Sequence, residues 1–388
     1  MIPREARPAL GGPSIVFLVP SLALGGAERQ LVGLSAGLHA AGWRVLVLRL
    51  YPGGELETDL VRRGVPTTAL DRRGRWDVIR VLVPLLRVLR RERPAVLHSY
   101  LVTPNVLSAF LKPFLPGVRI VWGVRAAWVD LARYRPSVTA VFTLSRGLAR
   151  FADLIICNSS AGMEYHVARG YPASRTVVIP NGIDATEFAP KRDARAALRR
   201  QWGFGEDDLV VGLVARLDPM KDHETFIRAA ARVAALRDDV RFVCVGDGPA
   251  GYQRRLWDLA SEVGLGDRMV LAGGRLDLPD VYNAFDLAVS SSSGEGFSNV
   301  IAEAMACGVP CVVTDVGDSR SIVGPTGWWC RPRDPVDLAR AIGCAVASKV
   351  ELAGRGLEAR RRVMTLYTEE RRDSATAEHL VALLSEER

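Results

Sequence analysis

The sequence predicts an α/β protein made of two doubly wound domains, each a parallel sheet covered by helices. Three observations support this prediction. The 388 residues suffice for two domains of ordinary size. Short apolar runs alternate with longer helical patterns along the chain, which is typical of parallel sheets. The turn-forming run Pro180-Asn181-Gly182 lies between the two halves.

In the first half, apolar runs of strand length are separated by two clear helical patterns. The expected strands are Ile15–Val19, Val45–Leu50, Ala95–His98, Ile120–Gly123 and Leu154–Asn158. The expected helices are Gln30–Ala41 and Val78–Glu92. This half is therefore expected to form one domain, spanning residues 1–175.

The second half repeats the same alternation. Its expected strands are Val210–Ala215, Val240–Gly246, Met269–Leu271, Leu287–Ser290 and Pro310–Thr314. The expected helices between them are Glu224–Arg237 and Tyr252–Val263. We expect a second domain at residues 176–365, followed by a C-terminal helix at 366–388 that packs back on the first domain.

Charge is distributed unevenly along the chain. Residues 1–175 contain 24 lysines and arginines against 11 acidic residues, whereas the remainder contains 27 against 32. A basic half suits nucleic acid, anionic lipid head groups or a phosphorylated substrate, although an arginine-rich composition without functional meaning also explains it. Nucleic-acid binding is the weakest of these, because the basic half lacks interleaved stacking aromatics and any recognised module.

The remaining compositional features indicate a cytoplasmic protein. The six cysteines form no Cys-x2-Cys pair and fall mostly in apolar patterns, as expected of reduced core residues. Five scattered histidines suggest no metal site. No run of about 20 apolar residues predicts a transmembrane helix. We interpret Ile15–Val19 as a first strand and not as a signal peptide, since Pro20 and Gly25-Gly26 follow it.

The segment Glu295-Gly-Phe-Ser-Asn-Val-Ile-Ala-Glu303 carries the most information about function. A helix is expected to begin near Ser298 or Asn299, and its free N–H groups and partial positive charge can bind a phosphate. Glu295 lies on the loop before this helix, and Glu303 about one turn inside it. Two carboxylates that flank an anion site suit a nucleotide sugar, with ribose hydroxyls at one end and hexose hydroxyls at the other. The alternative is a chance pair of solvated glutamates.

Two further loops have residues suited to phosphate groups. Arg216 and Lys221 follow an expected strand, and such cations can neutralise a diphosphate, although isolated loop charges are often merely solvated. Gly25 and Gly26 follow the first strand, where glycine lets a ligand approach the backbone. The full Gly-x-Gly-x-x-Gly fingerprint is absent there, which argues against NAD or FAD.

Taken together, these motifs resemble the retaining glycosyltransferases of family 4, or glycosyl transferases group 1. That family has the GT-B architecture, two Rossmann-like domains that face each other across a cleft. The resemblance is specific from Asn181 to about Gly324 and rests in the first domain on Gly25-Gly26-Ala27-Glu28. It implies that this glycine turn faces the donor phosphates and the transferred sugar. It also places Gly246 and Arg275 at the nucleobase.

The resemblance further implies a complete donor site. Glu303 would hold the ribose and Glu295 a sugar hydroxyl, while Arg216 and Lys221 would stabilise the leaving diphosphate. The residues expected to bind the donor are Gly25, Gly26, Arg216, Lys221, Gly246, Arg275, Glu295, Phe297, Ser298, Asn299, Val300 and Glu303. Those expected to be catalytic are Glu295, Arg216, Lys221 and Arg125. No cofactor or metal is expected, because two cations and a helix end carry the charge.

The first domain departs from the family pattern at one position. Many members have a histidine after the fourth strand, close to the transferred sugar, whereas Arg125 occupies that position here. An arginine can hydrogen-bond a hydroxyl or phosphate but cannot act as a base. His98 lies at the end of another strand. Its side chain could either enter the cleft or be buried in the core.

The reaction implied by this resemblance is transfer with retention of anomeric configuration, with the acceptor entering on the face that the diphosphate leaves. The donor would be a UDP- or GDP-linked hexose or N-acetylhexosamine. The acceptor would be a sugar or lipid-linked sugar, in bacterial cell-surface polysaccharide or glycolipid synthesis. A sugar-nucleotide epimerase with the same fold is the alternative.

A basic segment in the first domain suggests contact with the inner face of the cell membrane. Its charged residues flank Trp76 and continue along the expected helix at Val78–Glu92: Arg72, Arg73, Arg75, Arg80, Arg87, Arg90, Arg91 and Arg93. An amphipathic basic helix of this kind can lie on an anionic membrane. The alternative is a helix packed on the core with a charged outer face.

Overall fold

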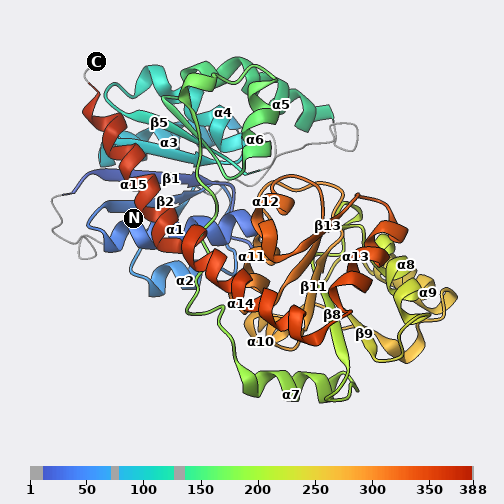
Figure 1. The fold of residues 1–388 in the computed structure, drawn as a ribbon. Coiled ribbons are helices and arrows are strands. Elements are labelled where there is room, and N and C mark those ends of the chain that lie inside the picture. The colour runs from blue at the N-terminus through green and yellow to red at the C-terminus, as the bar shows by residue number, and fades with distance from the viewer. Residues whose placement is uncertain (1–11, 71–77, 126–135, 387–388) are drawn as a thin grey trace. The chain divides into compact units, whose positions relative to one another are not determined.

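The computed structural model describes residues 12–70, 78–125 and 136–386, and the chain forms two compact units (Figure 1). The first unit comprises Met1–Gly182 and Glu369–Arg388, and the second comprises Ile183–Thr368. The division falls after Gly182 instead of after residue 175, because strand β7 (Thr176–Val178) pairs with β6 (Leu154–Cys157). The chain re-enters the first unit at Glu369.

The first unit contains a seven-stranded parallel sheet in the order β3-β2-β1-β4-β5-β6-β7. Its other strands are β1 (Ser14–Val19), β2 (Arg44–Arg49), β3 (Thr67–Ala69), β4 (Val96–Tyr100) and β5 (Arg119–Val124). The order reverses between β1 and β4. In open sheets of this type, ligands bind outside the carboxyl ends of the strands at such a switch point.

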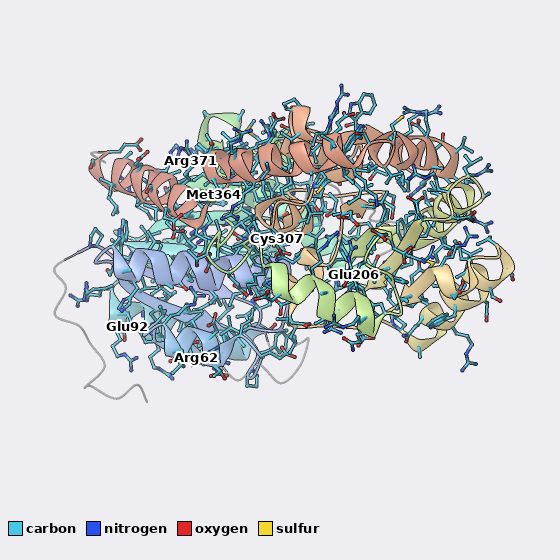
Figure 2. All side chains as sticks on the ribbon, turned by 60° about the horizontal axis from the view of Figure 1, so that its bottom comes forward. Arg62, Glu92, Glu206, Cys307, Met364 and Arg371 are labelled. Atoms are coloured by element: carbon cyan, nitrogen blue, oxygen red, sulfur yellow. The ribbon has the colours of Figure 1, made fainter. Side chains whose placement is uncertain are left out.

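Both faces of this sheet are covered by helices. Along β1, Ile15 and Phe17 pack into one buried cluster, and Val16 and Leu18 pack into the other, which explains the continuous apolar run. The helices are α1 (Gly26–Ala40), α2 (Glu57–Arg62), α3 (Val78–Glu92), α4 (Val102–Leu111), α5 (Pro136–Leu148), α6 (Ser160–Val167) and α15 (Glu369–Ser385). Figure 2 labels Arg62 and Glu92, the last residues of α2 and α3.

The C-terminal helix α15 packs on α1 (Figure 1). The two helices approach closely at Gly37, where a Cβ atom would overlap the Asp373 carboxylate. Arg372 of α15 is buried and donates a hydrogen bond of 2.8 Å to Gln30 Oε1. Gln30 also exchanges two hydrogen bonds with the backbone of Gly182, of 2.7 and 2.9 Å. One buried polar network therefore joins the first helix, the last helix and the end of the first segment.

The second unit contains a six-stranded parallel sheet in the order β10-β9-β8-β11-β12-β13. Its strands are β8 (Leu209–Val214), β9 (Val240–Val245), β10 (Met269–Leu271), β11 (Leu287–Ser290), β12 (Cys311–Thr314) and β13 (Trp328–Cys330). Its helices are α7 (Arg192–Gln201), α8 (His223–Ala234), α9 (Ala250–Glu262), α10 (Leu278–Asn283), α11 (Asn299–Ala306), α12 (Ser319–Val323), α13 (Pro335–Ala345) and α14 (Lys349–Leu366). Here the strand order reverses between β8 and β11.

The cysteines are free thiols, and all except the exposed Cys344 are buried. Cys307, labelled in Figure 2, follows the last turn of α11, and burial raises the pKa of its thiol to about 12. The prediction of core cysteines is therefore confirmed for all but Cys344. Separately, the helices of the described residues include none that is long and apolar enough to cross a membrane.

Candidate active site

The loop after β8 holds Lys221 in a defined position. Asp218 caps a short 3-10 turn, Pro219–Lys221, by accepting a hydrogen bond of 2.8 Å from the Met220 N–H. Asp222 then adopts a left-handed conformation with φ of 50° and caps α8 through the Thr225 N–H. Asp tolerates this conformation better than most residues. Lys221 is therefore the last residue of a capped turn that leads directly into the capped helix α8, at the carboxyl edge of the sheet.

Serines in the loop after β11 form hydrogen bonds with the loop that contains Lys221. The Ser291 hydroxyl lies 2.9 Å from the carbonyl oxygen of Lys221 and 3.0 Å from that of Asp222. The backbone N–H of Ser293 donates to the carbonyl oxygen of Met220 at 2.7 Å. These bonds fix the two loops side by side, and they follow from the switch in strand order between β8 and β11.

Lys221 and Glu295 form an ion pair at the meeting of these loops. Lys221 Nζ lies 2.5 Å from Glu295 Oε1, and the two side chains are only 17% and 9% exposed. The Ser292 hydroxyl donates to the same carboxylate oxygen at 2.7 Å. Behind the loop, Gly317 has a φ of 55°, and a Cβ atom there would overlap the carbonyl group of Glu295. Glu295 is thus held by its side chain and by close backbone packing.

Helix α11 begins beside Glu295 with an N-cap that uses no side chain. Ser298 is the N-cap residue, and within the described part of the chain its buried hydroxyl makes no capping bond and meets no partner. An orphaned hydroxyl next to the first N–H groups of a helix fits an anion or a sugar hydroxyl. Glu303, on the next turn, is 3% exposed and accepts a hydrogen bond of 2.8 Å from the Tyr282 hydroxyl.

The other expected donor residues of this unit occupy varied positions. Arg216 is exposed just beyond the end of β8. Gly246 lies against the same loop, where a Cβ atom would overlap the carbonyl oxygen of Ala215. Arg275 forms a bidentate pair with Asp277, at 2.8 and 2.6 Å, and these hydrogen bonds hold the Asp277 pKa below its usual value.

Two residues of the α11 segment are less open to a ligand than expected. The ring of Phe297 is buried and packs edge-on against Tyr367, with 5.3 Å between ring centres. The side chain of Val300 is partly buried against the same apolar cluster. A bound ligand could therefore contact the backbone of Phe297 but not its ring.

In the first unit, the glycine turn forms the start of α1. Gly25 is the N-cap residue and Gly26 the first residue of the helix. A Cβ atom at Gly25 would overlap the carboxylate of Glu28, so glycine lets this acidic side chain fold back over the helix start. The Gly-Gly-Ala-Glu sequence thus places a carboxylate at the carboxyl end of β1.

Arg125 follows β5 and is held by two neighbours. Its Nη2 atom donates to the Tyr100 hydroxyl at 2.5 Å, and its guanidinium lies 4.3 Å from the centre of the Tyr100 ring. Its Nη1 atom donates to Asn181 Oδ1 at 3.3 Å. Its buried Nε–H meets no acceptor among the described residues.

His98 lies in the core and not at the site. It is fully buried between Phe17 and Tyr100, with ring centres 5.3 and 4.9 Å away, and neither ring nitrogen meets a partner in the described part of the chain. Burial, and secondarily the Arg125 charge, lowers its pKa well below the usual value. Of the two placements left open by the sequence, the structure shows the core one.

Several supporting residues were missed by sequence reasoning. Ser292 orients Glu295, Tyr282 contacts Glu303, and Tyr100 and Asn181 hold Arg125. The serine run at 291–293 follows a strand, but serines are common in ordinary turns, so the run alone pointed to no particular role. The tyrosines had no distinguishing sequence context.

The two doubly wound parallel sheets have the GT-B fold of glycosyltransferases, as comparison with solved structures shows. The crystal structure of HepE from Anabaena in complex with UDP is similar, with a TM-score of 0.85 and 25% identity over 95% of this chain and 100% of that one. Sucrose-phosphate synthase from Thermosynechococcus elongatus shares the fold, with a TM-score of 0.81 and 22% identity over 96% and 99% of the two chains.

Family models match both halves of the chain. The model described as Glycosyltransferase Family 4 matches residues 24–187, and that described as Glycosyl transferases group 1 matches residues 208–348. The chain belongs to glycosyltransferase family 4.

Curated relatives agree with this assignment. A D-inositol 3-phosphate glycosyltransferase of Geodermatophilus obscurus is 36% identical over 60% of this chain and 53% of its own length. The UDP-Gal:alpha-D-GlcNAc-diphosphoundecaprenol alpha-1,3-galactosyltransferase of Escherichia coli is 28% identical over 62% and 63% of the two chains. The chain thus spans between about half and two thirds of the length of these relatives.

Proposed function

We propose that the protein is a retaining glycosyltransferase that moves a hexose or N-acetylhexosamine from a UDP- or GDP-sugar to a sugar or lipid-linked sugar. The observation that supports this most is the arrangement of Lys221 and Glu295 beside the start of α11. A cation, a helix N-terminus and two carboxylates, Glu295 and Glu303, come together on one edge of the second sheet. A diphosphate with hydroxyls on both sides suits this set.

Each group has a separate role in this proposal. Arg216, Lys221 and the first N–H groups of α11 stabilise the diphosphate as it leaves. Glu295 accepts a hydrogen bond from a hydroxyl of the transferred sugar, and Glu303 from the ribose, with Tyr282 fixing its orientation. The preorganised positive groups act on charge that develops in the transition state, and this effect usually contributes most to catalysis. These groups carry the charge without a metal ion.

Residues of the first unit would also contact the transferred sugar and the acceptor. We assign Arg125 to a sugar hydroxyl or phosphate, because it lies just beyond the carboxyl end of β5 and its guanidinium is held in place by Tyr100 and Asn181. Gly25 and Gly26 let the donor approach the start of α1. Since Arg125 cannot act as a base, the acceptor would lose its proton to the departing phosphate, on the same face of the sugar.

The relatives support the nature of donor and acceptor. HepE has been crystallised with UDP and with UDP-glucose, which supports a nucleotide-sugar donor. The E. coli galactosyltransferase is named for a diphosphoundecaprenol-linked acceptor, which supports a role in bacterial cell-surface polysaccharide or glycolipid synthesis. Both curated relatives carry transferase names, which favours transfer over the epimerase alternative.

Retention can be tested on the product. Incubation of the protein with an α-linked UDP- or GDP-sugar and an acceptor mixture should give an α-linked product, which NMR identifies from the one-bond C1–H1 coupling of its anomeric centre. A β-linked product would show inversion and would contradict the mechanism. Conversion of the donor to an epimer without any acceptor would favour the isomerase alternative.

The structure changes the form of the membrane hypothesis. Val81, Leu85 and Leu89 of α3 are buried in the core, whereas Arg87 and Arg90 are exposed. The apolar face of α3 is thus packed inward, as in the core-packed alternative. Arg72, Arg73, Arg75 and Trp76, together with the side chain of Arg80, lie outside the described residues. We propose a peripheral contact with anionic lipid that is electrostatic, made by the outer arginines of α3.

Liposome sedimentation tests this contact. The protein should bind vesicles containing phosphatidylserine at low salt and be released at high salt, because screening shortens the range of the attraction. The double variant Arg87→Ser/Arg90→Ser should lower the partition coefficient at least tenfold, at about 1 kcal/mol per arginine near the surface. The double variant Arg228→Ser/Arg254→Ser in the second unit is the matched control. Equal binding to neutral vesicles, or none at low salt, would rule out the proposed contact.

A further inference from the structure

Lys221 and Glu295 are assigned to different parts of the donor but are bonded to each other. The ammonium group lies 2.5 Å from the carboxylate, and both side chains are largely shielded from water. Ion pairs that are shielded in this way are costly to break without a replacement partner. The ammonium has three N–H donors, so a diphosphate that binds it must either share it with Glu295 or displace Glu295 from it.

We propose that Glu295 and the diphosphate exchange places on Lys221, and that this exchange makes the site discriminate between the sugar nucleotide and the nucleoside diphosphate product. The inference rests on the proposed function. When a sugar nucleotide binds, its phosphate takes Lys221 and a sugar hydroxyl donates to the released Glu295 carboxylate. A nucleoside diphosphate also takes Lys221 but has no sugar hydroxyl to offer, so Glu295 is left without its cation beside two negatively charged phosphates.

This asymmetry weakens the binding of the product. After the sugar has been transferred, Glu295 recovers Lys221, and the diphosphate loses a charge-assisted contact. Glu295 thus has a second role besides holding the sugar, since it promotes release of the nucleotide. The exchange is confined to side chains because the backbone of the two loops is joined: Ser291 bonds the carbonyls of Lys221 and Asp222, and Ser293 bonds that of Met220.

Calorimetric affinities for UDP and UDP-glucose, or for GDP and GDP-mannose if the protein prefers guanine, test the exchange. In Glu295→Gln, the competing charge is gone while the shape remains, so the nucleoside diphosphate should bind about tenfold more tightly, which corresponds to about 1.4 kcal/mol. The sugar nucleotide should gain nothing, since it loses a charged acceptor. Glu351→Gln, which alters an exposed carboxylate paired with Arg355, is the control and should leave both affinities unchanged.

A double-mutant cycle separates exchange from simple repulsion. In a Lys221→Met background, adding Glu295→Gln should tighten nucleoside diphosphate binding clearly less than in the wild-type background, because only the repulsion between carboxylate and phosphate is relieved and there is no ammonium to release. An equal gain in both backgrounds would show that Glu295 merely repels phosphate, and would overturn the exchange. Equal diphosphate affinity in the wild type and Glu295→Gln would overturn it too, while leaving the proposed function intact. A wild-type protein that binds neither nucleotide would contradict the proposed function itself. Circular dichroism confirms that each variant is folded.

Discussion

Replacing Lys221 by alanine should lower the rate of sugar transfer by a factor of about 10²–10³ while the protein stays folded. Removing one group that stabilises charge in the transition state typically costs about 2.7–4 kcal/mol of barrier. Lys221 is well placed for this effect, because it ends a capped turn directly before the capped helix α8 and only 17% of its side chain is exposed. Single-turnover kinetics with saturating donor would measure the loss.

The four lysines of the chain allow a matched control for this variant. Lys349 belongs to the same unit, and its Nζ atom donates to the carbonyl oxygen of Asp207 at the surface. Lys349→Ala should therefore keep wild-type activity. Wild-type turnover in Lys221→Ala would show that the lysine has no part in the reaction.

Replacing Glu295 by alanine should also abolish most transfer activity, with a loss of comparable size. The variant removes the acceptor for the sugar hydroxyl and leaves Lys221 without its partner. Because Glu295 is proposed to act on the sugar, the loss should appear in kcat with the sugar nucleotide. Affinity for the bare nucleoside diphosphate should not fall. Steady-state kinetics together with equilibrium binding would separate the two effects.

Glu351→Ala is the control for Glu295→Ala, because Glu351 is an exposed glutamate paired with Arg355 within one helix. Such pairs contribute little to stability, typically about 0.3–0.5 kcal/mol. Full activity in Glu295→Ala, with the control also active, would show that this carboxylate has no part in the reaction.

Much of the fold could be predicted from local sequence patterns. The helix expected at Val78–Glu92 is α3 with the same bounds, since its apolar spacing is regular. The start of α1 was misplaced at Gln30 instead of Gly26, because its N-cap is a glycine that lacks a capping side chain. Strands β3, β7 and β13 were not predicted, although β10, which is equally short, was. Each has three residues, so its sequence pattern is weak, and pairing with a neighbour in the sheet identifies it.

Individual residues of the site could be predicted from the sequence, but the contacts between them could not. Loop position and charge were sufficient to single out Lys221 and Glu295. Their mutual bond was not predictable, because it joins positions 74 residues apart through the switch in strand order. The contact of Tyr282 with Glu303 was not predictable either, because it depends on the packing of α10 against α11. Burial, which places His98 in the core, is likewise a property of the packed sheet and not of its own sequence neighbours.

Nucleotide binding tests the central claim most directly, through the thermal unfolding of the wild type and of Lys221→Ala in the presence of UDP, GDP, ADP and their sugar conjugates. A ligand at about 100 times its Kd adds about 2.7 kcal/mol of stability. One nucleotide class should raise the unfolding midpoint of the wild type clearly, and that of Lys221→Ala much less. An unchanged midpoint with every nucleotide, or an equal rise in both proteins, would contradict a donor site at Lys221.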